Sequence, residues 1–528
     1  MRISSLPRLW LAATISIACL SAADAGATLR KDAPLADAVK NRDKQAVQSL
    51  LKEQADVNAP QGDGATALHW AAYFGDAETA ALLINAGAQV STPNNYRVTP
   101  ILLASQNGFA AVIEQLLKAG ADPNSTMRSE ESALMLAARS GSVDAVQALL
   151  RGGADINAKE AWNGQTALIW AAAAAHAPVV KALIEAGADM SVRSNAGTTP
   201  FIFAVRKGDM ATVQEMLAGG ADVNEKRAPD QASPLLVAII NGHEDLVDLL
   251  LEKGADPNAE GGTTQLTVQD TKARPVEIEF ETPAHRQQLL QVATEGGNGG
   301  NNSFGRPLQA AVHVANWHVS DQFISVNMDR LRILKSLLVH GADVNGRNTD
   351  MEPRWSGARY RRRLVGATAF LFAAKAADLD VMRLLIEFGA DPNINTGANI
   401  TPLMAAAGIA WASNQERASE EEVLEVVKYL VEELGADVNA VNDVGETAMH
   451  AAAYRGANSV VQYLYDKGAD LGVVALDGRT PLIVASGVEY GNSFAAQPHT
   501  AVLLRKLGAK ERECPGLCVA LIPEEKLP

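Results

Sequence analysis

Short apolar stretches recur along the chain, and their spacing is that of helices. Residues Ala67 to Ala72 form one such stretch after Thr66, and Ile101-Leu102-Leu103 forms another after Thr99-Pro100. A Thr or Ser before an apolar run predicts an N-cap whose oxygen accepts a backbone N–H group. Proline suits the first helical position, where its missing N–H group costs nothing. The pattern therefore predicts a short first helix with a narrow face of Leu and Ala.

A turn and a second apolar stretch follow each first helix. After Asn241-Gly242-His243, the residues Leu246-Val247 and Leu249-Leu250 have helical spacing. Gly254 predicts a left-handed end to this second helix. Asp256-Pro257-Asn258 then turns the chain outward into a loop. Such a unit cannot bury its apolar faces alone, so we expect its stability to come from stacking on neighbouring units.

The unit recurs through most of the sequence, with steps of 33 or 34 residues in the first half. Gly-Ala-Asp, which closes a unit, occurs nine times, at Gly120, Gly153, Gly187, Gly220, Gly254, Gly341, Gly389, Gly435 and Gly468. The opening Thr or Ser signal lies at Thr66, Thr99, Ser132, Thr166, Thr199, Ser233, Thr368, Thr401, Thr447 and Thr480, with degenerate copies at Ala33 and Arg306. These signals predict twelve units.

The units closely resemble the ankyrin repeat. The match is clearest in Thr447-Ala448-Met449-His450-Ala451-Ala452 followed by Gly468-Ala469-Asp470, and the resemblance covers about residues 29–510 with interruptions. It implies an all-α fold: a curved α-solenoid of antiparallel helix pairs with β-turn fingers along one edge. We expect seven repeats in residues 29–260, five in 306–510 and a tail at 511–528.

The second half of the chain departs from the period, and such breaks often mark function. Ser233 and Arg306 are 73 residues apart, so we expect an insert at residues 261–305. Its alternating segments Gln265–Val268 and Val276–Phe280 predict a small β-hairpin, followed by a Gly/Asn-rich loop. Smaller expansions lie around Trp317–Met328, Asp350–Leu364, Trp411–Glu421 and Glu489–Asn492.

Composition narrows the class of protein. The chain has 528 residues, of which 46 are Lys or Arg and 61 Asp or Glu, giving a formal net charge of −15. This acidic balance argues against nucleic acid as a partner. Apolar residues make up 47% and charged residues 20%, which excludes disorder of the whole chain. The length alone suggests several domains, but the repeats predict one elongated body.

The first residues predict export. Arg2 and Arg8 precede an apolar run from Leu9 to Leu20, and small residues that fit signal cleavage after Ala25 follow. We therefore expect residues 1–25 to be a bacterial-type signal peptide and the protein to be periplasmic or secreted. No later stretch is long and apolar enough to predict an integral membrane segment. In an exported chain Cys514 and Cys518 form a candidate disulfide, and two free thiols are the alternative.

One loop concentrates positive charge in this acidic chain. Five arginines lie close together with two aromatic residues among them: Arg354, Trp355, Arg359, Tyr360, Arg361, Arg362 and Arg363. Arginine and aromatic residues are typical interface anchors, so the loop is a candidate docking patch for an acidic partner surface or polyanion. The alternative is a solvated loop that neutralises acidic neighbours or packs against an insert.

The resemblance to ankyrin repeats implies that partner contacts come from the fingers and from the positions after the Ala-Ala pair. The candidates are Tyr73, Phe74, Tyr454 and Arg455 after the pair, and Tyr96, Arg97 and Trp162 in the fingers. Packing between adjacent fingers is the alternative for each. Four aromatic residues inside the first helices are interpreted as mostly structural: Trp70, Trp170, Phe203 and Phe372.

No catalytic, cofactor-binding or metal-binding motif emerges. His69 and His450 occupy a repeat position where, by the resemblance, the ring braces a neighbouring finger, and His176 and His243 are turn residues. His-Glu-x-x-His, Gly-x-Ser-x-Gly and phosphate-loop signatures are missing from the sequence. We expect no enzyme and no cofactor.

The predicted function is that of an exported, monomeric scaffold that binds a protein partner. Its contacts are expected to come from the finger loops, the concave face and the insertions of the C-terminal half. The alternative is a module for a small molecule or polysaccharide, with a site formed by insertions near Trp317, Trp355 and Trp411.

Overall fold

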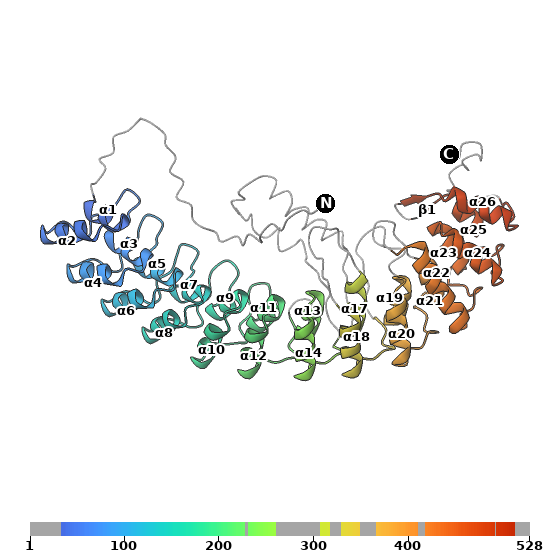
Figure 1. The fold of residues 1–528 in the computed structure, drawn as a ribbon, viewed down its shortest axis with the longest axis horizontal. Coiled ribbons are helices and arrows are strands. Elements are labelled where there is room, and N and C mark those ends of the chain that lie inside the picture. The colour runs from blue at the N-terminus through green and yellow to red at the C-terminus, as the bar shows by residue number, and fades with distance from the viewer. Residues whose placement is uncertain are drawn as a thin grey trace, which may run out of the picture.

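The structure is a computed structural model that describes residues 33–227, 231–259, 307–316, 329–348, 366–409, 418–490 and 493–512. Within these ranges twelve antiparallel helix pairs stack side by side into a curved arc (Figure 1), as the repeats predict. The first helices of the pairs are α1 (Pro34–Lys40), α3 (Ala67–Phe74), α5 (Pro100–Gln106), α7 (Ala133–Ser140), α9 (Ala167–Ala174), α11 (Pro200–Lys207), α13 (Pro234–Ile240), α17 (Pro307–Asn316), α19 (Ala369–Lys375), α21 (Pro402–Ala407), α23 (Ala448–Arg455) and α25 (Pro481–Ser486).

The second helices run antiparallel to the first. They are α2 (Lys44–Lys52), α4 (Ala77–Asn85), α6 (Ala110–Lys118), α8 (Val143–Arg151), α10 (Ala177–Glu185), α12 (Met210–Ala218), α14 (Glu244–Glu252), α18 (Arg330–Val339), α20 (Leu379–Glu387), α22 (Glu420–Lys428) with its continuation η2 (Tyr429–Glu433), α24 (Asn458–Asp466) and α26 (Pro498–Lys506). The first helices line the concave side of the arc and are called inner helices, and the second are called outer helices (Figure 1).

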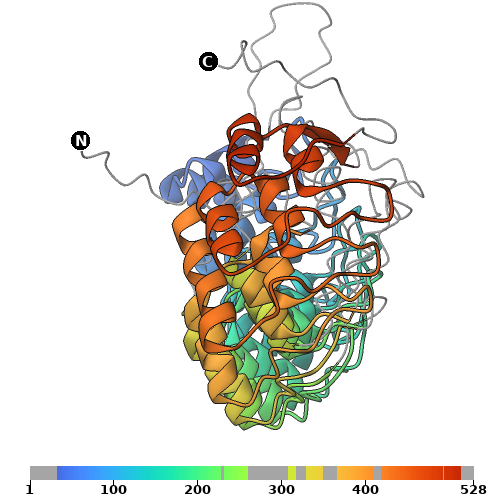
Figure 2. The same ribbon diagram turned by 90° about the vertical axis from the view of Figure 1, so that its right-hand side faces the viewer.

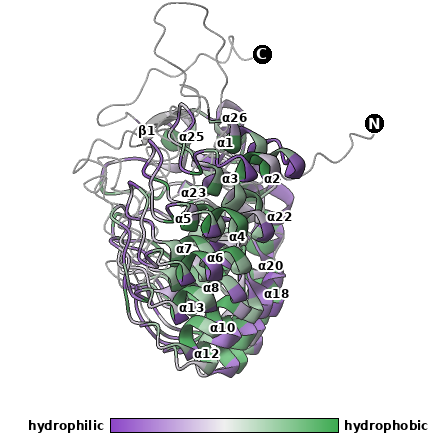
Figure 3. Cartoon of the chain, turned by 90° about the vertical axis from the view of Figure 1, so that its left-hand side faces the viewer, coloured by the Kyte–Doolittle hydropathy of each residue, from purple (hydrophilic) through white to green (hydrophobic). Residues whose placement is uncertain are grey.

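The loops between pairs form fingers that project from one edge of the stack (Figure 2). Colouring by hydropathy shows the apolar residues gathered along the helices and mainly polar residues in the fingers (Figure 3). The core runs through the whole array as one continuous cluster of Ala, Leu, Val and Ile. The fold therefore offers two surfaces besides the convex side: the concave face and the finger edge.

Local sequence explains each helix pair. In α11 the hydroxyl of Thr199 accepts a hydrogen bond from the backbone N–H of Ile202 at 3.3 Å, and Pro200 occupies the first turn. Gly208 ends this helix in the left-handed region, with φ of 77°. After the outer helix α14, Gly254 has φ of 87°. The predicted cap at Thr199 and the helix ends at Gly208 and Gly254 are thus confirmed, whereas Thr99, another predicted N-cap, makes no side-chain hydrogen bond to its helix.

An asparagine clamp joins successive fingers. The side-chain amide of Asn58 donates to the carbonyl of Gly87 at 3.1 Å, and the N–H of Gln89 donates to Asn58 Oδ1 at 2.8 Å. The same pair of bonds recurs at Asn124, Asn224, Asn258, Asn345 and Asn439. Each clamp fixes one repeat against the next.

The clamp at Asn258 crosses the long expansion of the sequence. Asn258 donates to the carbonyl of Gly341 at 2.9 Å and accepts from the N–H of Asp343 at 2.7 Å, although Gly341 lies 83 residues downstream. On the convex side Arg332 of α18 makes ion pairs of 2.6 Å with Asp245 and Asp248 of α14. The seventh and eighth helix pairs therefore stack directly on each other.

A one-residue expansion is absorbed by a π-helical turn. Leu83 of α4 lies four residues before Gly87, which closes its unit, whereas the equivalent Leu430 lies five residues before Gly435. The N–H of Ala436 donates to the carbonyl of Leu430 at 2.9 Å. In the regular unit the equivalent bond runs from the N–H of Ala88 to the carbonyl of Leu83, so it spans one residue fewer. The widened turn is η2, and it lets the extra residue enter without ending the helix.

The strands within the described residues form one short hairpin in the last unit. There β1 (Val488–Tyr490) pairs antiparallel with β2 (Ser493–Ala495), with Glu489 opposite Phe494. The predicted hairpin in 261–305, the signal peptide at 1–25 and the tail beyond residue 512 lie outside the described residues. No helix in the described ranges has both the length and the apolar character needed to cross a membrane.

Candidate binding surface

Three aromatic side chains of α3 form a cluster on the concave face. Trp70 and Tyr73 are three positions apart on the helix, so their rings meet, edge to face, at 5.9 Å between centroids. Phe74 stacks on Trp70 at 6.0 Å and meets Tyr73 at 5.2 Å. Trp70 also donates its indole N–H to Gln61 Oε1 at 2.8 Å, while 46% of Tyr73 stays exposed.

Cations from the preceding repeat lie over these rings. Lys40 Nζ of α1 is 4.8 Å from the centroid of Trp70, and the Arg42 guanidinium is 4.2 Å from that of Phe74. Such contacts are attractive because the ring face is electronegative. The position of Trp70 inside the first helix predicts a mostly structural role. The ring does pack against the core, yet it also carries a cation at the concave surface.

The same arrangement recurs further along the concave face. The guanidinium of Arg139 in α7 lies 4.8 Å from the ring of Trp170 in α9, and that of Arg206 lies 4.7 Å from Phe203 within α11. A ring covers one face of a guanidinium but leaves the N–H groups at its edge able to donate. Trp170 is partly exposed, whereas Phe203 is buried. The concave face thus presents oriented cations on aromatic supports.

Two of the predicted finger aromatics are mostly exposed: Tyr96 to 69% and Trp162 to 56%. Arg97, beside Tyr96, occupies the left-handed region with φ of 63°, as a tight finger turn requires. Neighbouring fingers are joined by their backbones, for example by the N–H of Asn195 donating to the carbonyl of Asn163 at 2.7 Å. The exposed rings are therefore carried by linked fingers.

The last fingers carry exposed aliphatic residues that the sequence analysis missed. Leu476 is 80% exposed, and Val441 and Val474 are also exposed. The N–H of Leu476 donates to the carbonyl of Val444 at 2.9 Å, so both fingers hold these side chains along one edge. The sequence does contain a signal, because Val441 lies four residues before Gly445, and Val474 and Leu476 lie four and two residues before Gly478, at the finger turns.

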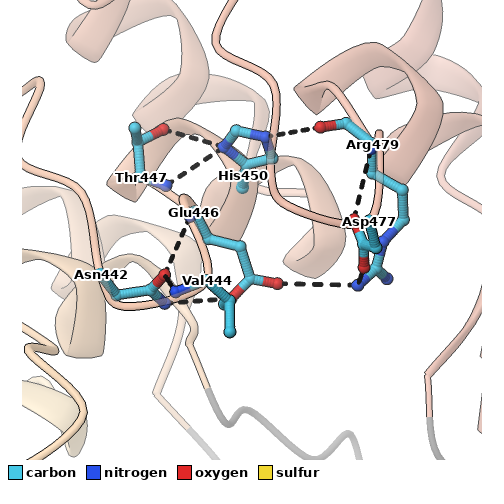
Figure 4. A network of polar contacts seen from close by, with 7 residues as sticks. All are labelled: Asn442, Val444, Glu446, Thr447, His450, Asp477 and Arg479. Atoms are coloured by element: carbon cyan, nitrogen blue, oxygen red, sulfur yellow. Dashed lines mark hydrogen bonds and ion pairs between the residues drawn. The ribbon is translucent and has the colours of Figure 1, made fainter.

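A buried carboxylate stiffens these fingers (Figure 4). Glu446 is buried, and its backbone N–H donates to Asn442 Oδ1 at 2.9 Å while its Oε2 accepts from Asn442 Nδ2 at 3.1 Å. Arg479 of the following finger approaches Glu446 Oε1 at 3.9 Å and also pairs with Asp477. The two fingers are therefore held at their bases by charge as well as by backbone bonds.

Histidine braces complete the support. His450 Nδ1 accepts from the N–H of Thr447 at 3.1 Å, so Nε2 carries the proton and donates to the carbonyl of Arg479 at 3.3 Å (Figure 4). His69 bonds Thr66 and Val98 in the same way. Burial lowers the pKa of both imidazoles, which keeps them neutral. The predicted bracing role is confirmed.

The late candidates Tyr454 and Arg455 make contacts within the chain. Arg455 is half-buried and donates to the carbonyl of Ala418 at 2.9 Å. The carbonyl of Tyr454 accepts from Gln497 Nε2 at 3.2 Å. The remaining predicted residues lie outside the described residues: Trp317, Arg354, Trp355, Arg359, Tyr360, Arg361, Arg362, Arg363, Trp411, Cys514 and Cys518. In the part of the chain that is described, no cluster of three His, Cys, Asp or Glu side chains could hold a metal ion.

Comparison with known proteins identifies the repeat. Residues 35–127, 104–194, 172–261 and 416–496 match the family profile for ankyrin repeats in three copies, and residues 365–397 match the single ankyrin repeat. Human ankyrin repeat and SOCS box protein 16 is 33% identical over 158 residues, which is 30% of this chain and 32% of that protein. The B-cell lymphoma 3 protein homolog of Mus musculus is 32% identical over 55% of this chain and 48% of its own length.

These matches cover about a third to a half of the relatives' own length. Among solved structures, the ankyrin repeat domain of human ASB11 aligns with 43% of this chain and all of its own chain, at 24% identity and a TM-score of 0.39. The family matches span most of the helix pairs described above. The chain belongs to the ankyrin repeat family.

Proposed function

We propose that this chain is an exported, non-enzymatic scaffold that binds a protein partner along its concave face and finger edge. The observation that carries the proposal is the set of aromatic side chains with cations over their rings on the stacked inner helices, from the Trp70 cluster with its exposed Tyr73 to the exposed Arg206. Aromatic and Arg residues are the usual anchors of protein interfaces. The clamps between repeats hold these residues in place before binding, so little ordering entropy opposes it.

Export is supported by the first residues alone. Arg2 and Arg8, the apolar run that follows and the small residues before Gly26 have the composition of a cleaved signal peptide. We place the mature scaffold in the periplasm or outside a bacterial cell. There it would act as a monomer, because its array is long enough to supply a continuous core without a second copy.

Affinity capture from the native compartment, followed by mass spectrometry, tests partner binding. The variant of interest replaces two finger aromatics, Tyr96→Ser with Trp162→Ser. The matched control replaces two exposed apolar residues of outer helices, Val339→Ser with Tyr465→Ser. We expect a protein that the wild type and the control recover and that the finger variant loses.

Recovery of the same proteins with all three baits would contradict a role for the finger edge. Recovery of none by the wild type, under conditions where the bait stays folded, would contradict the scaffold proposal as a whole. Circular dichroism of each bait shows that its helices are intact, so lost capture reports the surface and not the fold.

A further inference from the structure

The two layers of helices carry opposite charge. Among the described helices, the inner ones hold six Lys or Arg residues and one carboxylate, Asp37. The outer ones hold twelve Lys or Arg residues and eighteen Asp or Glu residues. The inner helices, which line the concave face, therefore carry a net positive charge in a chain whose net charge is −15.

Several cations of the two layers also differ in their contacts. Seven of the twelve outer cations pair with carboxylates: Lys44, Arg151, Lys181, Arg330, Arg332, Arg383 and Arg505. Three cations of the inner helices, Lys40, Arg139 and Arg206, have no carboxylate partner among the described residues, and neither has Arg42 in the turn between α1 and α2. Each of these four cations lies over an aromatic ring, which holds it in place without neutralising it.

The surroundings of Arg206 disfavour its positive charge. Burial and the neighbouring guanidinium of Arg227 both lower the pKa of Arg206. Its side chain lies over Phe203, while its carbonyl accepts from His243 Nε2 at 3.0 Å, so the backbone beneath it is fixed. An incoming carboxylate would relieve the repulsion between the two arginines and meet a preoriented donor.

We propose that the concave face between α1 and α11 binds an extended acidic segment of a partner protein, with carboxylates seated on Lys40, Arg42, Arg139 and Arg206. This inference rests on the proposed function and names the class of partner. Charge complementarity favours an acidic ligand. The rings of Trp70 and Trp170 favour a polypeptide, because apolar side chains between its carboxylates can pack on them.

The repeat spacing sets the spacing of those carboxylates. Inner helices pack about 10 Å apart, so Arg139 of α7 and Arg206 of α11 are separated by about 20 Å. An extended peptide advances about 3.3 Å per residue, so about six residues join two carboxylates over this span. Lys40 of α1 lies three helices before α7, which corresponds to about nine residues. A segment of about 20 residues covers all four cations.

The test uses a fluorescein-labelled peptide of about 20 residues. Its Glu pairs are separated by about nine and about six residues, as the distances between the inner helices require, and Leu and Ser fill the positions between them. Its partner peptide has Gln at each Glu position. Fluorescence anisotropy measures binding to the full chain, to Arg139→Glu with Arg206→Glu, and to Lys52→Glu with Lys118→Glu. These two lysines also end helices and make no ion pair with described residues, but they lie in outer helices α2 and α6.

We expect the affinities of the wild type and of the Lys52→Glu/Lys118→Glu control for the Glu peptide to agree within about 2-fold. The Arg139→Glu/Arg206→Glu variant should bind this peptide at least about 10-fold more weakly, and the difference should shrink at high salt. Equal affinity of the wild type for the Glu and Gln peptides would overturn the proposal. An equal loss of affinity in the Arg139/Arg206 variant and in the Lys52/Lys118 control would overturn it too. Tighter binding of a heparin oligosaccharide than of the Glu peptide would also overturn the proposal, because the concave face would then be a general polyanion site. A captured partner that depends on the finger residues but not on Arg139 and Arg206 would overturn this inference and leave the proposed scaffold function standing.

Discussion

Replacing Asn258 by alanine tests whether the stack is continuous across the longest expansion of the sequence. The side chain makes two hydrogen bonds to the eighth repeat, 2.9 Å to the carbonyl of Gly341 and 2.7 Å from the N–H of Asp343. Its backbone bond to Asp256 lies within its own finger and survives the change. The substitution therefore removes contacts across one boundary between repeats and little else.

The expected cost follows from those two bonds. A hydrogen bond contributes about 0.5–1.5 kcal/mol net to stability, so losing both costs about 1–3 kcal/mol at this boundary. Because repeats interact with their nearest neighbours, the loss weakens the coupling of the seventh and eighth pairs first. Amides near the boundary open more often, and about 1–3 kcal/mol corresponds to about 5- to 150-fold faster exchange.

Hydrogen exchange with mass spectrometry localises this effect better than a global unfolding curve, since long repeat arrays depart from two-state unfolding. The matched control is Asn124→Ala. Asn124 makes the same two bonds, to Gly153 at 3.3 Å and from Asp155 at 2.7 Å, where the sequence has no expansion. We expect faster exchange in α13, α14, α17 and α18 for Asn258→Ala, and in α5 to α8 for Asn124→Ala.

One outcome would refute the reasoning. If Asn124→Ala speeds exchange around its boundary and Asn258→Ala leaves α17 and α18 unchanged, the two halves of the chain do not stack through this clamp. The seven and five repeats would then behave as separate arrays, and the concave face could not run uninterrupted past α13.

Three further results are expected. Gly208→Ala should lower the melting temperature more than Gly254→Ala, since both have φ near 80–90° but only at Gly208 would a Cβ lie 2.4 Å from the His243 ring. Burial holds the pKa of His450 in the folded chain below its ordinary value of 6.5, so the unfolded chain binds more protons as the pH falls below that value. The free energy of unfolding should therefore decrease from pH 7 toward pH 5, and urea unfolding should show a weaker decrease with pH for His450→Gln. N-terminal sequencing of the protein from the extracellular or periplasmic fraction should begin after Ala25, and an intact Met1 there would contradict the predicted signal cleavage.

The helix pairs could be predicted from the sequence because their causes are local. Thr199 caps α11, Pro200 starts it and Gly208 ends it, all within ten residues of chain. The brace of His450 on the next finger followed from its place in the repeat. Such features recur with the period, so one clear unit predicts the others.

The binding surface could be predicted only in part, because it depends on contacts between repeats. Arg139 lies on the ring of Trp170, a residue from another helix pair, and no pattern within either helix indicates this. The exposed Val474 and Leu476 could not be recognised as surface residues, because an aliphatic residue next to a turn is equally compatible with packing in the core. The opposite charge of the two helix layers was visible in the sequence only once inner and outer helices had been sorted.

Breaks in the sequence period do not become breaks in space. The clamp joins Asn58 to Gly87 across 29 residues, Asn345 to Gly389 across 44 and Asn258 to Gly341 across 83, yet all three donor–acceptor distances lie between 2.9 and 3.1 Å. Extra residues therefore enter between clamped groups and leave the boundary between repeats intact. The insertions are thus free to differ in length, while the inner helices stay stacked in one continuous core along the concave face. The part of the fold that repeats most strictly is thus the part that the proposed acidic segment needs.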